Sequence, residues 1–302
     1  MSRPLGLAAV LVVTAAIPPL LPSAPQDTEV TPVPVAPGVT MLMGQGGNVG
    51  VIVGDDGVLM IDSQFAEMTK KLQAAVGALT DRPVKYLLNT HWHFDHTGGN
   101  ENLGKQGVIV VAHDNVRARM SHDQEMPAFG RTVEAAPEVA RPLLTFADEV
   151  TFHLAGKTLR VFHVANAHTD GDAILHDVED DVFHAGDTFF NGFYPFIDAG
   201  SGGSIDGMIA ANDVLLALAD GDSKIIPGHG PLGDKASLRA FRDMLATVSE
   251  RVHAKLDAGM TKDDIVASKP TADLDAEWGD GFLPADMWVG LVVDGILTQR
   301  AR

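Results

Sequence analysis

The chain has 302 residues, of which 45% are hydrophobic and 21% charged, a composition typical of globular proteins and unlike disordered or fibrous ones. Its 40 acidic and 22 basic residues give a formal net charge of −18, and such a surface repels nucleic acid and anionic lipid, so we expect neither as a partner. The sequence contains no cysteine, which excludes disulfides, thiolate metal ligands and a cysteine nucleophile.

Residues 1–24 have the features of a secretory signal peptide. Arg3 precedes an apolar run from Leu5 to Ile17, and prolines follow the run. The run is short for a membrane span, so an uncleaved N-terminal anchor is the less favoured alternative. We therefore expect a periplasmic or secreted protein with no stable membrane insertion after processing.

The rest of the chain divides into a linker and one domain. Residues 25–38 are rich in proline and are predicted to form an extended linker. Residues 39–302 are predicted to form a single domain in which strands alternate with helices.

Short apolar runs and segments of helical spacing alternate along this domain. The runs predicted to be strands are Val39–Met43, Asn48–Val53, Val58–Asp62, Val84–Asn89, Val108–His113, Glu149–Leu154, Thr158–Val164, Ala173–Val178, Asp181–His184 and Lys224–Pro227. The segments predicted to be helices are Gln64–Leu79, Ser204–Ala219 and Asp234–Ala258. Alternation of this kind favours β-sheets covered by helices.

Residues 120–147 fit neither period. Long irregular stretches inside a compact domain are often lids or binding loops, and a plain surface insertion is the equal alternative. If the segment is a lid, His122 would line the cleft beneath it.

Three histidines and an aspartate lie within six residues, directly after an apolar strand: His91, His93, Asp95 and His96. Imidazole and carboxylate are ligands that Zn²⁺ prefers. On an extended backbone His91, His93 and Asp95 share one face, whereas His96 points elsewhere. The segment therefore predicts a metal site with a second position beside the first.

Three further candidate ligands, His168, Asp187 and His229, each come after an apolar strand and before a turn. The ends of neighbouring strands meet at one edge of a sheet, so these side chains can reach the same point. Each of them alone would be weak support for a metal site.

The order His91-x-His93-x-Asp95-His96, then His168, Asp187 and His229, resembles the metallo-β-lactamase superfamily. This resemblance implies an α/β fold, the αββα sandwich of two mixed sheets flanked by helices. It also implies a first metal on His91, His93 and His168, a second on Asp95, His96 and His229, and Asp187 bridging both. Asp62 stands where the family keeps a carboxylate that orients a ligand imidazole; a turn residue at a strand end is the alternative.

The resemblance also implies the chemistry. We expect two zinc ions, with iron or manganese as alternatives, and a bridging hydroxide that attacks the carbonyl of an amide, lactam, lactone, ester or thioester. Asp95 would orient the hydroxide and shuttle its proton. A bridging aspartate such as Asp187 resembles the arrangement in glyoxalase II-type thioesterases and lactonases, and true β-lactamases usually lack it. The resemblance therefore implies that β-lactamase activity would be secondary. A non-catalytic, metal-binding secreted protein is the alternative from another class.

The aromatic segment after Asp187 is a candidate wall of a pocket for a small-molecule substrate. Tyr194 or Asn191 is predicted to meet the substrate carbonyl. The phenylalanines are predicted to pack beneath the site, and such packing is the equal alternative for Tyr194. Ser204 is predicted to cap the following helix.

Overall fold

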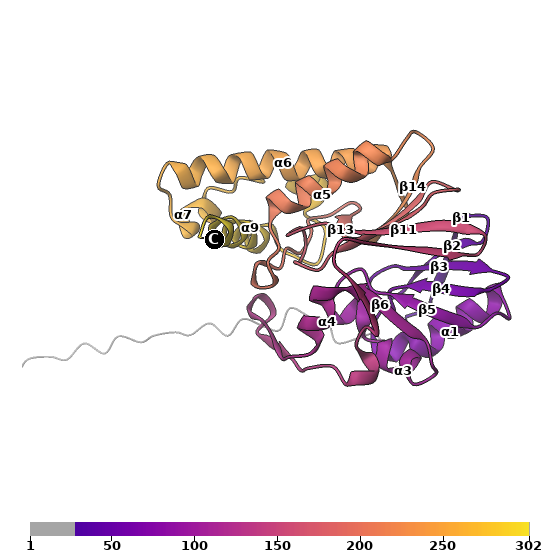
Figure 1. Ribbon diagram of the computed structural model, residues 1–302. Helices are drawn as coiled ribbons and strands as arrows, with labels where there is room; N and C mark the ends of the chain where they lie inside the picture. Colours follow the sequence, from indigo (N-terminus) through magenta and orange to yellow (C-terminus); the bar gives the residue numbers. More distant parts are fainter. Residues whose placement is uncertain (1–27, 302) are drawn as a thin grey trace, which may run out of the picture.

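Two β-sheets lie face to face in the computed structural model, which describes residues 28–301, and helices cover the outer face of each sheet (Figure 1). This is the αββα sandwich implied by the resemblance, and that prediction is confirmed. The predicted signal peptide, residues 1–24, lies outside the described residues.

The first sheet has the strand order β1-β2-β3-β4-β5-β6-β9. Strands β1 to β4 are joined in antiparallel pairs, and β4, β5, β6 and β9 run parallel. The bounds are β1 (Thr31–Ala36), β2 (Val39–Met43), β3 (Val49–Gly54), β4 (Gly57–Ile61), β5 (Val84–Leu88), β6 (Ile109–His113) and β9 (Leu144–Phe146).

The second sheet follows the chain in the order β10-β11-β12-β13-β14-β15, antiparallel except for the parallel pair β13 and β14. The bounds are β10 (Glu149–Leu154), β11 (Lys157–His163), β12 (Ala173–Asp177), β13 (Val182–Phe190), β14 (Lys224–His229) and β15 (Gly233–Asp234). A separate hairpin consists of β7 (Gln124–Met126) and β8 (Arg131–Val133).

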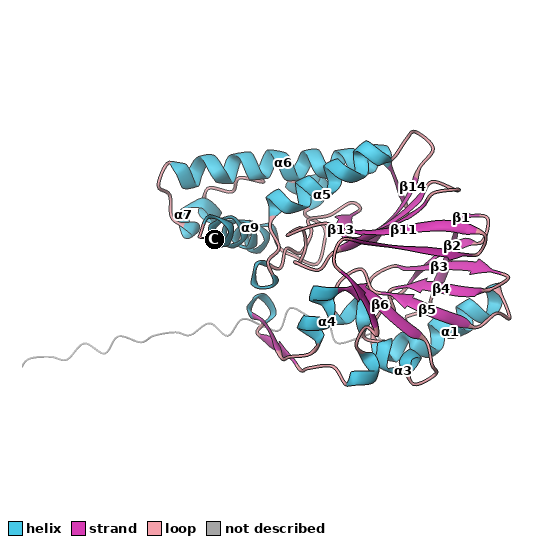
Figure 2. Ribbon diagram, viewed as in Figure 1, coloured by secondary structure: helices cyan, strands magenta, loops and turns pink. Residues whose placement is uncertain are grey.

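Helices form the two outer layers, with α1, α3 and α4 against the first sheet and α5, α6 and α9 against the second (Figure 2). The α-helices are α1 (Thr69–Leu79), α2 (Phe94–Thr97), α3 (Asn100–Gly104), α4 (Asp114–Met120), α5 (Ile205–Leu218), α6 (Lys235–Asp257), α7 (Lys262–Ala267), α8 (Asp275–Trp278) and α9 (Ala285–Arg300). The 3₁₀ turns are η1 (Ala66–Met68), η2 (Pro127–Phe129), η3 (Glu138–Ala140) and η4 (Ala199–Ser201). Among the described residues, no helix combines the length and apolarity needed to cross a membrane.

Strand β4 shows how the sequence builds the layers. Its residues are all buried, and successive side chains point to opposite faces of the sheet. Leu59 and Ile61 join the core between the two sheets, whereas Val58 and Met60 join the core beneath α1. A strand covered on both faces therefore reads as a continuous apolar run.

The predicted linker is wrong in part, because residues 31–36 form strand β1 and pair with β2. Val33 and Val35 pack against the core between the sheets. Pro32 and Pro34 are compatible with this pairing because β1 is an edge strand, where a missing N–H leaves no ladder bond unmade.

Most predicted boundaries agree with the structure, and the exceptions have local causes. The first helix begins at Thr69 and not at Gln64, because Asp62 and Gln64 adopt left-handed backbone angles, with φ of 65° and 51°. Strand β13 continues to Phe190, beyond the predicted end at His184. Ser204 caps α5 as predicted, accepting a hydrogen bond from the N–H of Gly207.

The segment 120–147 is not irregular throughout, since it contains the β7–β8 hairpin, two 3₁₀ turns and strand β9. Met126 and Phe129 from this segment line a cavity at the candidate site described below. His122 does not line that cavity; it is exposed, and its Nδ1 lies 3.1 Å from the carbonyl of Ala118.

Candidate metal centre

Four of the predicted ligands follow strand β5 in one short segment. His93 is the N-cap of the one-turn helix α2, so Asp95 and His96 lie on a helical turn. His91, His93 and His96 are buried, and the side chain of Asp95 is 22% exposed. Because the backbone turns at α2, Asp95 does not share a face with His91 and His93, as an extended chain would require, but groups with His96.

The other three candidates come from the second sheet. His168 lies in the loop between β11 and β12, Asp187 lies within β13, and His229 is the last residue of β14. The structure brings all three to the segment that follows β5. The seven side chains predicted as ligands therefore meet at the seam between the two sheets.

A bulge in β13 places Asp187. The register with β14 shifts on both sides of Gly186, which has a left-handed φ of 52°. A Cβ atom at this position would lie 2.6 Å from the Cβ of Thr90. Only glycine meets both the steric and the backbone requirement here.

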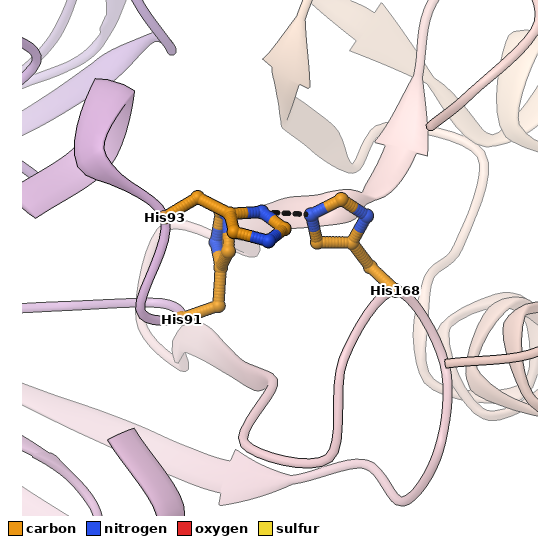
Figure 3. A group of neighbouring side chains, drawn as sticks. All are labelled: His91, His93 and His168. Atoms are coloured by element: carbon orange, nitrogen blue, oxygen red, sulfur yellow. Dashed lines mark hydrogen bonds between the residues drawn. The ribbon is translucent and has the colours of Figure 1, made fainter. Parts of the chain in front are cut away.

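His91, His93 and His168 form a first group (Figure 3). Nδ1 of His93 lies 2.8 Å from Nε2 of His168. The ring nitrogens that point away from this contact, the outward nitrogens, face acceptors. Nε2 of His93 lies 3.0 Å from a carboxylate oxygen of Asp198, and Nδ1 of His168 lies 2.8 Å from the carbonyl of Phe196. Since these acceptors have only lone pairs, the outward nitrogens carry protons. When both rings are neutral, the two inward nitrogens then present lone pairs to each other.

Asp95, His96 and His229 form a second group. Nε2 of His229 lies 3.3 Å from Nε2 of His96 and 3.3 Å from a carboxylate oxygen of Asp95. Nδ1 of His96 lies 2.8 Å from a carboxylate oxygen of Asp62, which orients the ring.

Asp187 lies between the two groups. Its carboxylate oxygens are 3.8 Å from Nε2 of His91 and 3.4 Å from Nε2 of His168. They are also 3.0 Å from Nε2 of His96 and 3.5 Å from Nε2 of His229. One carboxylate is therefore within reach of both groups.

Asp62, at the end of β4, accepts three hydrogen bonds. The N–H and the hydroxyl of Thr90 donate to it over 2.8 and 2.6 Å, and Nδ1 of His96 is the third donor. The Thr90 hydroxyl also lies 3.1 Å from Nδ1 of His91. Asp62 thus holds His96 of the second group directly, and it reaches His91 of the first group only through Thr90.

Burial and neighbouring charges shift the pKa values of the candidate ligands in opposite directions. Burial lowers the pKa of His168 to about 4. Burial acts in the same direction on His229, but the charge of Asp187 and hydrogen bonds to Asp187 and Asp95 outweigh it and raise the pKa to about 9. The pKa of Asp95 falls to about 2 because the charge of His96 and contacts with His229 outweigh the opposing effect of burial.

Two residues that support the site have no counterpart in the sequence analysis. Asp198 holds the ring of His93, and its pKa is about 2 because the hydrogen bond and charge of His93 outweigh burial. Asn48 donates two hydrogen bonds to carbonyls on either side of His229. Neither belongs to a spaced motif that could have identified it.

The two predicted substrate contacts lie elsewhere. Tyr194 is 1% exposed, its ring stacks on Trp288 with centroids 4.1 Å apart, and its hydroxyl donates to Asp275 over 2.9 Å. The amide of Asn191 donates to the carbonyl of Pro231. Neither residue lines the cavity at the candidate site, so these positions disagree with a contact to the substrate carbonyl.

A cavity of about 450 Å³ opens on the site. Four of the seven candidate ligands line it: His93, Asp95, Asp187 and His229. Volumes of about 300–1,000 Å³ are usual for small-molecule sites. A substrate in this cavity would contact both groups of ligands.

The chemistry of these seven side chains fits metal ions independently of the family resemblance. Nε2 of His91 is a buried nitrogen without a hydrogen-bond partner among the described residues. The facing lone pairs of His93 and His168 repel each other unless a cation lies between them. Five imidazoles and two carboxylates in two groups are consistent with a dinuclear metal site.

Comparisons with known proteins agree with this geometry. Residues 42–229 match the sequence profile of the metallo-beta-lactamase superfamily. A hydroxyacylglutathione hydrolase of Polaromonas sp. (strain JS666) is 23% identical over 190 residues, which is 60% of this chain and 65% of that protein. The human acyl-coenzyme A thioesterase MBLAC2 is 24% identical over 212 residues, which is 62% of this chain and 74% of that protein.

The chain spans only 36% to 65% of the length of the hydroxyacylglutathione hydrolases that it matches. Among solved structures, it resembles the stereoselective inverting sec-alkylsulfatase Pisa1 from Pseudomonas sp., with a TM-score of 0.67 and 18% identity. That likeness covers 87% of this chain and 50% of the sulfatase, and at this identity it concerns the fold alone.

Proposed function

This chain belongs to the metallo-β-lactamase superfamily of metal-dependent hydrolases, and from this premise we propose that it is a dinuclear zinc enzyme that cleaves acyl bonds. The observation that carries the proposal is the position of Asp187, within 3.8 Å of histidines from both ligand groups. A shared carboxylate holds two ions close enough to act on one substrate.

In this proposal His91, His93 and His168 hold the first ion, Asp95, His96 and His229 hold the second, and Asp187 contacts both. Imidazole-rich sets with carboxylates suit zinc, and iron or manganese are the alternatives that metal analysis would identify. When bound, zinc supplies a nucleophilic water at neutral pH and polarises a carbonyl oxygen.

Asp95 has the position of a proton acceptor. Its carboxylate lines the cavity, and its low pKa keeps it ionised at neutral pH. We propose that its free oxygen accepts a hydrogen bond from the attacking water, aligns it toward the carbonyl carbon, and passes its proton to the leaving group.

Thioesters, esters and lactones are the acyl bonds we favour. The relatives named as hydroxyacylglutathione hydrolase and acyl-coenzyme A thioesterase cleave thioesters by their names, and this supports the same reaction type here. Amide and β-lactam cleavage would be a secondary activity. Residues 1–24 support a periplasmic or secreted location for the enzyme.

Metal analysis together with a substrate panel tests the proposal. The purified protein should contain two equivalents of zinc, lose turnover on dialysis against a chelator and regain it when zinc is added. The panel contains a β-lactam, a lactone, an alkyl thioester and an aryl ester. A zinc-loaded protein that hydrolyses none of them is better described as a non-catalytic metal-binding protein, and the proposal would then be wrong.

A further inference from the structure

Six apolar side chains surround the cavity that opens on the ligand groups: Phe65, Phe94, Met126, Phe129, Phe196 and Phe282. They come from separate parts of the chain, including α2, the β7–β8 hairpin and the loop that precedes α9. Phe282 lines the cavity and is 44% exposed, so it lies at the rim. The fold therefore brings aromatic surface to this cavity from several directions.

The rings continue directly from the ligands. Phe196 packs against the imidazoles of both His93 and His168, with centroids 5.7 Å apart in each case. Phe129 extends this surface, since its ring lies 4.8 Å from that of Phe196. A substrate whose carbonyl lies at the ligand groups must place its remaining atoms against these rings.

A second wall lies beside Asp95. Phe94 precedes this residue on α2, and its ring centroid is 5.8 Å from that of Phe65. Both phenylalanines line the cavity. Aromatic surface thus lies on either side of the position that the substrate would occupy.

The charges at the cavity do not favour an anionic substrate body. Among the described residues that line it, the carboxylates are Asp95 and Asp187, none is lysine or arginine, and the two histidines, His93 and His229, belong to the ligand groups and not to the aromatic walls. The nearby cation of Arg131 lies over the ring of Phe94, 4.2 Å from its centroid, and is not part of the lining. The charge of bound zinc would act on the reacting carbonyl and not on the far end of the substrate.

From this combination we propose that the substrate carries its scissile carbonyl on an apolar, uncharged body, as in an ester, lactone or thioester with an alkyl or aryl side chain. This inference rests on the proposed acyl hydrolysis and narrows it. Glutathione and coenzyme A thioesters have anionic leaving groups, and β-lactam antibiotics carry a carboxylate. All three would meet aromatic rings where they need a cation.

Matched aryl esters test this preference on the zinc-loaded, full-length protein. The probes are p-nitrophenyl acetate, p-nitrophenyl hexanoate and mono-p-nitrophenyl adipate; the last two match in length and differ by a terminal carboxylate. Each buried CH₂ group raises kcat/KM by up to about fourfold, so we expect hexanoate to exceed acetate by about tenfold or more. Adipate should fall below hexanoate by about tenfold, because its carboxylate loses hydration without gaining a partner.

Variants of Phe129 test whether the aromatic wall causes the expected preference for the longer apolar chain. F129A should lower kcat/KM for hexanoate by about fivefold more than it lowers kcat/KM for acetate, because the longer chain would have more contact with the ring. F129K should reverse the preference toward adipate. L143A is the control, since Leu143 is 71% exposed and does not line the cavity. Melting temperature and zinc content are measured for each variant, and F282A provides a second rim variant if F129A does not fold.

The outcomes separate this inference from the proposed function. Equal or faster turnover of adipate in the unmodified protein overturns the apolar-substrate inference and leaves acyl hydrolysis intact. If R131Q then removes that turnover, Arg131 is the anion receptor. If the zinc-loaded protein turns over none of the three esters and none of the β-lactam, lactone and thioester of the substrate panel, acyl hydrolysis itself is contradicted, and this inference fails with it. If it cleaves the thioester but no ester, the same comparison is made with hexanoyl and adipoyl thioesters.

Discussion

Asn48, which directly precedes β3 of the first sheet, holds the backbone on both sides of His229 in the second sheet. Its side-chain amide donates to the carbonyls of Pro227 and Gly230 over 3.0 and 2.9 Å, and its own N–H donates to the carbonyl of Gly228 over 2.7 Å. Asn48 is buried, so the backbone around His229 depends on these bonds.

The N48A substitution should therefore weaken the second ligand group. Loss of a residue that orients a ligand costs about 10–100-fold in metal affinity. We expect one of the two zinc equivalents to bind more weakly, as measured by zinc titration with a chromophoric chelator. N102A is the matched control, because Asn102 makes similar amide contacts at a half-buried position away from the site. Unchanged affinity of both equivalents would show that His229 does not need Asn48.

Asp62 and Asp198 should affect different ions. Asp62 contacts His96 and Asp198 contacts His93, so each fixes the tautomer of a ligand in a different group. An asparagine amide facing the ring favours the tautomer whose inward nitrogen is protonated, which costs about 10–100-fold in metal affinity. D62N should weaken mainly the second ion and D198N mainly the first. Cobalt substitution followed by visible spectroscopy distinguishes the two, and identical spectra for both variants would contradict the assignment.

The two ligand groups should bind zinc with different pH dependence. His168, with a pKa of about 4, is neutral above about pH 5 and already able to bind a metal. His229, with a pKa of about 9, and His96, whose pKa the charges of Asp187, Asp95 and Asp62 raise well above its usual range against the effect of burial, must both lose a proton on binding, so the affinity of the second group rises steeply with pH up to about pH 9. Titration with zinc should therefore give one tight equivalent near about pH 5.5 and two near about pH 8. Parallel loss of both equivalents on acidification would contradict this.

D95N tests the role of the cavity-facing carboxylate. Asparagine retains an oxygen ligand but cannot take up a proton, so kcat should fall by about 100-fold or more while zinc content is kept. The measurement is steady-state turnover of the best substrate beside metal analysis of the same sample. Turnover within a few-fold of the unmodified enzyme would show that another group accepts the proton.

G186A should destabilise the fold as well as the site. The left-handed φ costs a non-glycine residue about 1–2 kcal/mol, and the clash with Thr90 adds to it, so we expect a loss of about 2–4 kcal/mol in the free energy of unfolding. G77A is the control: Gly77 lies in α1 with no atom within 4 Å of the added Cβ, and alanine there should stabilise by about 0.5–1 kcal/mol. Urea denaturation of both variants checks the prediction.

The fold and the ligand set are predictable from the sequence because both depend on residue type and spacing. The alternation of apolar strands with helices indicates the two covered sheets. The histidines of the segment 91–96 and the later candidates each follow a strand, and strand ends converge at a sheet edge. Within this segment, only the helical turn of α2 differs from the extended backbone that the sequence analysis assumed. This turn moves Asp95 away from His91 and His93.

The supporting contacts are not predictable in the same way. Asn48 acts on carbonyls 179 and 182 positions away, and backbone carbonyls are present at every residue, so the contact leaves no mark on the partner sequence. Tyr194 is a similar case. Its ring can pack on Trp288 or line a cavity equally well by residue type, and only the position of α9 decides between them.

The division of the seven ligands between the sheets has a consequence for the order of folding. The half of the chain that ends with β9 supplies His91, His93, Asp95 and His96, and the half that begins with β10 supplies His168, Asp187 and His229. Neither half alone offers a complete set of donors for either ion. If the seven residues bind two ions as proposed, tight capture of metal must be a late event, and each captured ion would be a cross-link that resists the separation of the two halves.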